Sequence, residues 1–336
     1  MVRLADKLPV LIAKNNPFEL LFSPVKKAWS ISNMRLFQRC KRKFFWKDLW
    51  GLSSKVTESF FIIGSAYHEG LAKWYKSHGK NMKLIARALK VKYTKTALQD
   101  IDLRDPEDAE DLIAQISSLE GMLIGYSEVY PDDLVDFVID PTNIEKWFSV
   151  DCEDFIFKGK VDFIGRQKKN IVVMEHKTAS KFNEAYIDTL PVDTEARGFL
   201  YGIKYGLGLN PGKVIYSIVK KTKLRGKSNE SHTALCKRIS NDYMLRPDFY
   251  FHREVLRYSM SDLATFEQDL FRTHEEYRWF MQSPKARTDP CLWPTSDGEC
   301  RTFGSTCPFL TLCVEGLDRS TAKLYRQYIP KLGAHS

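Results

Sequence analysis

The chain has 336 residues, 43% of them hydrophobic, and a formal net charge of +9. A chain of this length and apolar content can bury a sizeable core, as one large domain or two small ones. No window of the sequence is long and apolar enough to span a bilayer, so we expect no membrane association. The positive charge fits a polyanionic partner.

The basic residues gather in two stretches. Asn33–Lys47 and Pro211–Lys227 each hold six basic residues and no acidic one, whereas Asp100–Asp111 is strongly acidic. This segregation indicates a surface for a polyanion, although two ordinary solvated faces would give the same pattern.

The N-terminus does not have the form of a signal peptide. Its short apolar patch, Leu8–Ile12, is interrupted by Lys14 and by the polar residues that follow it. We therefore expect a cytoplasmic protein, bacterial or in the host cytoplasm if phage-encoded. In that setting the seven cysteines are expected to serve a metal or to remain free thiols.

The first part of the chain is predicted to be helical. Apolar residues recur there at helical spacing in four stretches, and the last stretch stops near Pro131. The predicted helices span Ser32–Trp50, Ser59–Ser77, Met82–Leu98 and Pro106–Val129.

Short β-branched and aromatic runs follow, separated by turn residues. Residues 166–170 are expected to form a tight turn between two of these runs. The resulting order of helices, a three-strand meander, a helix and further strands predicts a mixed α/β fold. The predicted strands span Phe137–Ile139, Trp147–Val150, Asp154–Ile164, Asn170–Lys177, Val214–Val219 and Asp248–Tyr258, and the predicted helices span Glu195–Tyr205 and Asp262–Met281.

Three charged residues at the ends of apolar runs form the candidate active site. Asp162 and Glu175 meet if their strands pair across the 166–170 turn, and Glu175 and Lys177 point to one face because they are two residues apart. Two carboxylates can hold a hard divalent cation, and a lysine beside them can orient an attacking water or stabilise charge on a phosphate. A solvent-facing salt bridge is the alternative, but buried runs on both sides favour a functional site.

His68 is a further candidate ligand. A histidine on the predicted helix Ser59–Ser77 could add a nitrogen ligand and favour manganese over magnesium. A structural histidine would produce the same isolated signal.

Four cysteines crowd the end of the chain, and a fifth, Cys40, lies far upstream. An iron–sulfur cluster takes four thiolates, which Cys40, Cys300, Cys307 and Cys313 could supply. Zinc bound by Cys291 and the last three cysteines is the alternative, but structural zinc prefers closely spaced cysteine pairs, which are absent from this sequence. Cys152 and Cys236 are isolated and are expected to be structural.

Taken in order, these motifs resemble those of the RecB-like branch of the PD-(D/E)XK nuclease superfamily, which includes the Cas4-like and AddB-type iron–sulfur nucleases and phage relatives. The similarity extends over residues 30–313, nearly the whole chain. The motifs are Ser30-x-Ser32 with Phe37-x-x-Cys40, Gly64-x-x-x-His68, Gly159-x-x-Asp162, Glu175-x-Lys177 and Cys300-x6-Cys307-Pro308-x4-Cys313.

The resemblance implies a restriction-endonuclease-like αβββαβ core, expected within residues 136–283. A helical part (1–135) would precede this core, and an iron–sulfur segment (284–336) would follow it, all within one integrated domain. The resemblance also implies His68, Asp162 and Glu175 as ligands of Mg²⁺ or Mn²⁺ and Lys177 as the catalytic lysine. A [4Fe–4S] cluster on Cys40, Cys300, Cys307 and Cys313 would join the two ends of the chain.

The sequence departs from this family at two places. Where relatives carry Gln-x-x-x-Tyr after the lysine strand, this chain has Glu195 and Phe199, or Arg197 and Tyr201 in a shifted alignment. The last cysteine motif also begins with Cys-x6-Cys, where many relatives have Cys-x2-Cys. The residue that assists the active site from this helix is therefore left open between Glu195 and Arg197.

Two basic groups are candidate DNA contacts. Arg39, Lys41, Arg42 and Lys43 adjoin Phe44, Phe45 and Trp46, a combination suited to phosphates and stacked bases, although the aromatic residues could equally be core. A basic loop after a strand contains Lys221 and Lys223.

The sequence therefore predicts a metal-dependent DNA nuclease. We expect an exonuclease acting on DNA ends or single strands, with possible partners in recombination, repair or replication. The alternatives are a catalytically inactive DNA-binding or recombination scaffold and a zinc-stabilised RNA-binding protein.

Overall fold

The computed structural model describes residues 27–55, 59–99, 106–180, 182–302, 305–318 and 320–327. The N-terminal segment discussed above and residues 100–105 of the acidic stretch lie outside the described residues. The chain forms two compact units, unit 1 from residues 1–55, 149–159 and 264–336 and unit 2 from residues 56–148 and 160–263. The fold is mixed α/β, as predicted, while the three-part division of the chain stays a prediction.

Unit 2 contains a helical layer whose members match three predicted helices closely. Tyr67 and Tyr126 are fully buried in one cluster with Phe163 and Met174 of the sheet. Burying side chains of this size stabilises the fold by about 1.5–3 kcal/mol each. The helices are α5 (Ser59–Lys76), α6 (Met82–Leu98), α7 (Pro106–Val129), α8 (Asp133–Asp136) and α11 (His232–Leu245), the last of which was not predicted.

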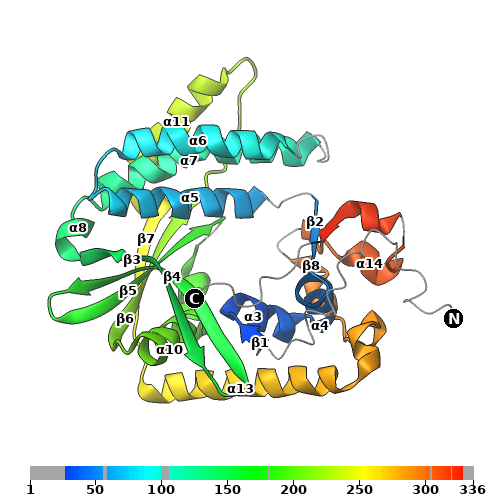
Figure 1. Ribbon diagram of the computed structural model, residues 1–336. Coiled ribbons are helices and arrows are strands. Elements are labelled where there is room, and N and C mark those ends of the chain that lie inside the picture. Colours follow the sequence, from blue (N-terminus) through cyan, green and yellow to red (C-terminus); the bar gives the residue numbers. More distant parts are fainter. Residues whose placement is uncertain are drawn as a thin grey trace. The chain divides into compact units, whose positions relative to one another are not determined.

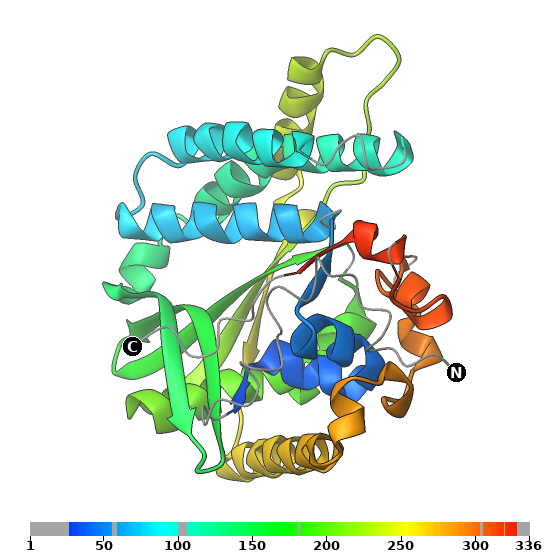
Figure 2. The same ribbon diagram turned by 45° about the vertical axis from the view of Figure 1, so that its right-hand side comes forward.

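The helical layer covers one face of the sheet of unit 2, and α10 (Thr194–Leu207) lies on the other face (Figures 1 and 2). Strand β3 pairs with β4, β4 and β5 are antiparallel, β5 and β6 are parallel, and β6 and β7 are antiparallel. The helix between the two parallel strands is the crossover that such a pair requires. The strands are β3 (Val138–Asp151), β4 (Phe155–Gln167), β5 (Asn170–Ala179), β6 (Pro211–Lys220) and β7 (Phe251–Leu256).

Close packing fixes α10 within unit 2. A Cβ atom added at Gly202 would overlap the ring of Phe148 on β3, so a glycine is needed where this helix approaches the strand. Asp193 caps the start of α10 through the backbone N–H of Glu195, and Gly208 ends the helix with a φ of 66°.

The structure corrects several predicted boundaries in unit 2. Gln167 pairs with Asn170, so only two residues form the turn between β4 and β5, and Lys168 there has a φ of 55°. The predicted strand Asp248–Tyr258 begins instead with a helical turn, α12 (Pro247–Tyr250), because Pro247 has no N–H to donate to a strand partner. The predicted strands Phe137–Ile139 and Trp147–Val150 are parts of the single strand β3.

Unit 1 joins segments from the two ends of the described chain. Strand β1 (Lys27–Trp29) pairs in parallel with residues 155–157 of β4, and β2 (Leu52–Ser54) pairs antiparallel with β10 (Tyr325–Gln327), as the blue and red strands in Figure 2 show. The helices of the unit are α3 (Ile31–Arg39), α4 (Lys41–Phe44), a π-helical turn (Phe45–Leu49), most of α13 (Met260–Gln282) and α14 (Leu310–Val314), and its shortest strands are β8 (Arg301–Thr302) and β9 (Ser305–Thr306).

The predicted helix Ser32–Trp50 is interrupted at Cys40. Cys40 has extended backbone angles, φ −152° and ψ 103°, between α3 and α4. The N–H of Arg42 donates to the carbonyl of Pro294 at 3.0 Å, so a partner distant in sequence replaces the helical hydrogen bond. The cysteine therefore lies at a kink, and Ser30 begins α3 with a capping box shared with Asn33.

Candidate active site

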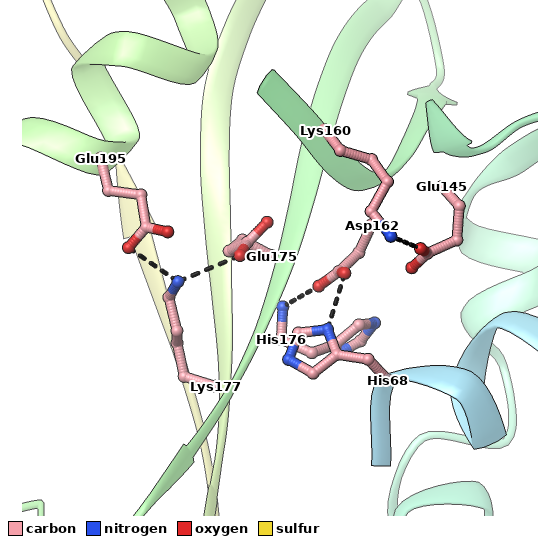
Figure 3. Close-up of polar contacts among 8 residues, drawn as sticks. All are labelled: His68, Glu145, Lys160, Asp162, Glu175, His176, Lys177 and Glu195. Carbon is pink, nitrogen blue, oxygen red and sulfur yellow. Dashed lines mark hydrogen bonds and ion pairs between the residues drawn. The ribbon is translucent and has the colours of Figure 1, made fainter. Parts of the chain in front are cut away.

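The β4–β5 hairpin of unit 2 brings the two predicted carboxylates together. Phe163 pairs with Met174, and Asp162 and Glu175 are the next residues beyond this pair on the two strands. Glu175 and Lys177 share one face of the sheet because they are two residues apart. Figure 3 shows these side chains converging.

Both oxygens of Asp162 are engaged. Its Oδ1 atom lies 2.7 Å from Nδ1 of His68, which α5 supplies. Its Oδ2 atom accepts a hydrogen bond of 2.6 Å from the backbone N–H of His176. These two contacts fix the orientation of the carboxylate and place His68 beside it.

Lys177 joins two carboxylates on the same side of the site. Its ammonium group lies 3.0 Å from Oε1 of Glu175 and 2.8 Å from Oε2 of Glu195. Glu195 comes from the first turn of α10, the helix after the lysine strand. Of the two alternatives left open for this helix, Glu195 contacts the lysine, whereas Arg197 donates to the carbonyl of Val192 at 2.9 Å and Tyr201 is buried.

Glu145 is a member of the site that the sequence analysis missed. Its carboxylate pairs with Lys160, and one of its oxygens lies within 4.8 Å of ligand atoms of His68 and Asp162. Among the described residues, these three side chains form the group compact enough to hold a single metal ion. Glu145 has a φ of 56° within β3, a conformation that a sequence does not reveal for a residue other than glycine.

The charges of the site shift the pKa values of its members in opposite directions. Burial lowers the pKa of His68, but the charge and hydrogen bond of Asp162 outweigh burial and raise it to about 8. Burial, followed by repulsion from Asp162, raises the pKa of Glu175 to about 8. Burial lowers the pKa of Lys177, but Glu175 and Glu195 raise it well above its usual value, so the lysine stays charged.

These residues fit a divalent cation. Oε2 of Glu175 is buried and has no hydrogen-bond partner among the described residues. Burying a carboxylate oxygen in this way destabilises the fold unless a ligand binds to that oxygen. A set of one imidazole nitrogen and several carboxylate oxygens suits Mg²⁺ or Mn²⁺. Within the described residues, His68, Asp162 and Glu145 lie close enough together to hold one ion, and the charge of Asp162 reaches Glu175, the other predicted ligand.

A polar network supports the opposite face of the sheet, where His176 points. Asp133 is buried and accepts from Tyr75 at 2.7 Å, from Tyr126 at 2.8 Å and from Arg253 at 2.6 Å. The ring of His176 stacks on that of Tyr75 with centroids 5.9 Å apart. This network holds the backbone of His176, and with it the N–H that contacts Asp162.

The four predicted cluster cysteines all belong to unit 1. Burial raises the pKa of Cys307, and the nearby thiols of Cys40 and Cys300 raise it further. Burial also raises the pKa of Cys313, followed by Cys307 and Cys40. Cys291 is exposed. Among the described cysteines, no three sulfur atoms lie within 4.8 Å of one another, as they would around a single zinc ion.

The basic residues of α3 and α4 contact other residues of unit 1. Lys41 pairs with Glu276 at 3.0 Å, Arg42 donates to the carbonyl of Trp293 at 3.0 Å, and Arg39 lies 4.0 Å from Glu299. Phe44, Phe45 and Trp46 are fully buried, so the suggested stacking of bases on these rings is wrong and the core alternative holds. Lys43 is partly exposed.

Lys223 in the second basic group is exposed, whereas Lys221 is buried. No helix within the described ranges is both long and apolar enough to cross a membrane.

Comparisons with known proteins give one family match and two solved structures that are similar to the chain. A family model for the PD-(D/E)XK nuclease superfamily matches residues 28–314. A solved structure from Eubacterium rectale, named "Putative exonuclease", is 9% identical, with a TM-score of 0.42 over 87% of this chain and 94% of its own. A structure named SSO0001 is 16% identical, with a TM-score of 0.23 over 55% of this chain and 84% of its own. No curated protein matches the chain.

Proposed function

Since this chain belongs to the PD-(D/E)XK nuclease superfamily, as the match over residues 28–314 establishes, we propose that it is a divalent-metal-dependent deoxyribonuclease that uses Asp162, Glu175 and Lys177. Membership of this superfamily implies hydrolysis of phosphodiester bonds in DNA. The observation that carries the proposal is the convergence of these three residues, with Lys177 held between Glu175 and Glu195.

The roles follow from the contacts. A bound Mg²⁺ or Mn²⁺ supplies an activated water and stabilises charge on the phosphate. Asp162, oriented by His68 and the His176 N–H, and Glu175, with one oxygen lacking a partner among the described residues, are the ligands that this geometry supports. Lys177 remains protonated and is placed to donate to a phosphate oxygen as negative charge develops. Glu195 positions Lys177 and does not touch the reacting atoms.

We further propose an exonuclease that acts on ends or single strands, as the similarity to the RecB-like branch implies. In the same proposal, Cys40, Cys300, Cys307 and Cys313 hold a structural [4Fe–4S] cluster that ties the chain ends of unit 1. Support comes from the location of all four cysteines in unit 1, from the effect of Cys40 on the pKa values of Cys307 and Cys313, and from the pairing of β2 with β10. A cubane is larger than a single ion, so its ligand sulfurs need not lie as close together as zinc ligands do.

An assay on end-labelled DNA tests the function. Anaerobically purified protein is incubated with linear single-stranded, linear double-stranded and circular DNA, with Mg²⁺, Mn²⁺ or EDTA. We expect cleavage of linear DNA that requires metal and is lost on Asp162→Asn, because the amide cannot replace the carboxylate ligand. The matched control Asp136→Asn, at an exposed aspartate of the same unit, should cleave normally.

The result also decides between the enzyme and the inactive scaffold. Binding of DNA without any metal-dependent cleavage would support the scaffold and contradict the nuclease. Cleavage of circular DNA at the same rate as linear DNA would overturn the exonuclease assignment alone.

A further inference from the structure

Unit 2 contains a cavity of about 430 Å³ outside the acidic site. It lies where β6 ends, and its lining includes Lys220, Lys221, Lys223 and Arg246 together with the rings of Phe182 and Phe249. None of the described residues that line it is acidic. A volume in this range accommodates a small organic ligand such as one nucleotide unit.

The strand register relates this cavity to the catalytic lysine within unit 2. Ile218 of β6 pairs with Lys177 of β5, and Lys220 pairs with Ala179. Lys220 is two residues beyond Ile218, so its side chain shares the sheet face of Lys177, about 7 Å further along the strand. Lys220 therefore connects the cavity, at the end of β6, with the sheet face that carries the acidic site.

An aromatic ring holds two of the cations close together. The ammonium group of Lys220 lies 3.5 Å from the ring centroid of Phe249, and the guanidinium of Arg246 lies 4.7 Å from it. A ring stabilises cations without neutralising them, because it attracts them through its quadrupole. Positive charge in the cavity therefore remains available to an anion.

Carboxylates act on part of this charge, since Asp111 attracts Lys221 and Asp242 pairs with Arg246. By contrast, within the described part of the chain no ion pair joins Lys220 or Lys223 to an acidic residue. Burial lowers the pKa of Lys220, and repulsion from Lys223 and Arg246 lowers it further, as expected where cations converge. An incoming phosphate would relieve this repulsion.

We propose that this cavity is a subsite for a non-scissile phosphate of the DNA strand, with the adjoining nucleotide against Phe182. Lys220, Lys223 and Arg246 would bind the phosphate. The inference rests on the proposed function, since it assumes that the bound polyanion is the strand being cut. It assigns the cavity a role in positioning substrate and none in the chemistry.

Equilibrium binding without metal tests the subsite independently of cleavage. Fluorescence anisotropy with a labelled single-stranded oligonucleotide in EDTA is measured over a range of salt concentrations. We expect Lys220→Gln with Lys223→Gln to weaken binding on the order of tenfold and to reduce the slope of log affinity against log salt by about 1 for each phosphate that the variant no longer binds. Lys223→Gln alone, at an exposed position, gives a smaller change with no risk to folding.

A matched control distinguishes binding of DNA at the subsite from attraction of DNA by the net charge of the protein. Lys169→Gln removes one positive charge at the exposed turn before β5, the opposite end of that strand from the cavity. It should leave the salt slope unchanged. Equal effects of this control and of Lys223→Gln on binding would overturn the subsite, because they would show attraction by net charge alone.

Kinetics distinguish failure of the subsite from failure of the nuclease proposal. With the double variant, KM for a long oligonucleotide should rise about tenfold at unchanged kcat, whereas hydrolysis of a chromogenic thymidine 5′-phosphodiester, too short to reach the cavity, should be unaffected. Equal effects on both substrates would overturn the subsite. If wild-type protein hydrolyses neither substrate with any divalent metal, the nuclease proposal fails, and the binding assay still decides whether the cavity holds phosphate.

Discussion

The acidic site of unit 2 and the cysteine group of unit 1 are organised by different means. In unit 2, regular strands set the positions of Asp162, Glu175 and Lys177, and hydrogen bonds and ion pairs complete the arrangement. In unit 1, Cys40 lies at a kink between two helices, Cys313 lies in α14, and burial raises the pKa of Cys307 and of Cys313. The first site is preorganised by its sheet, whereas the cysteines of the second come from short and irregular segments.

The largest predicted effect concerns Lys177 and tests the preorganised site. Lys177→Met should lower kcat about 10²- to 10³-fold, since it removes a cation placed to stabilise charge on the phosphate, while the dependence on metal concentration changes little. Cleavage rates measured over a range of Mg²⁺ concentrations give kcat and the Mg²⁺ concentration for half-maximal cleavage as separate values. The control Lys213→Met, which removes a lysine from the start of β6 in the same unit, should retain full activity. A decrease in metal affinity as large as the decrease in rate would show that Lys177 serves the fold of the site and not the reaction.

The second prediction tests whether the cysteine group depends on a cofactor. Cys40→Ser should remove the visible iron–sulfur absorbance and lower the thermal midpoint by roughly 5 °C or more, because cluster binding contributes folding free energy. Iron and acid-labile sulfide per chain, with calorimetry, provide the measurement. Cys291→Ser, at the exposed cysteine, should change neither. If Cys291→Ser abolishes the metal content and Cys40→Ser does not, the cluster assignment is wrong and the zinc alternative returns.

The third prediction concerns the ligand that only the structure reveals. Glu145→Gln should raise the metal concentration for half-maximal cleavage about tenfold, because it removes one charged oxygen beside His68 and Asp162. Cleavage titrated with Mn²⁺ measures this shift. Glu153 also has a positive φ but is exposed in a turn, so Glu153→Gln is a matched control that should have no effect. An unchanged midpoint for Glu145→Gln would restrict the ion to the residues predicted from sequence.

The sequence predicted those parts of the site that depend on regular periodicity. Glu175 and Lys177 share a face because strands alternate, and their approach to Asp162 requires only a hairpin. Glu145 could not be predicted, because its approach depends on a positive φ within a long strand. The kink at Cys40 depends on the carbonyl of Pro294, a residue distant in sequence. From the sequence alone, the aromatic residues after Cys40 could have contacted DNA or packed in the core. The tertiary structure buries them in the core.

The fourth prediction tests how firmly packing holds the acidic site. Gly202→Ala should destabilise the protein by about 1–3 kcal/mol, because the added methyl group overlaps the ring of Phe148 where α10 meets β3. Urea unfolding measures the change. Gly208 ends the same helix in open space, so Gly208→Asn, which tolerates a positive φ, should cost much less. A neutral Gly202→Ala would mean that α10 shifts easily, and that Glu195 does not depend on this contact.

The last prediction concerns unit 1 and its response to acid. Nδ1 of His274 accepts a hydrogen bond of 3.0 Å from the indole N–H of Trp29, and burial, followed by repulsion from Arg278, lowers the pKa of His274 to about 4. The unfolded chain, with an ordinary histidine pKa near 6.5, binds a proton that the folded chain excludes. Stability from this group is therefore present above about pH 6.5 and is lost as the pH falls toward 4, by at most about 1.4 kcal/mol per pH unit. His274→Gln keeps an acceptor for Trp29 but cannot titrate, so urea unfolding from pH 4 to 7 should give the variant the flatter curve. Parallel curves for the two proteins would show that other groups control the acid sensitivity.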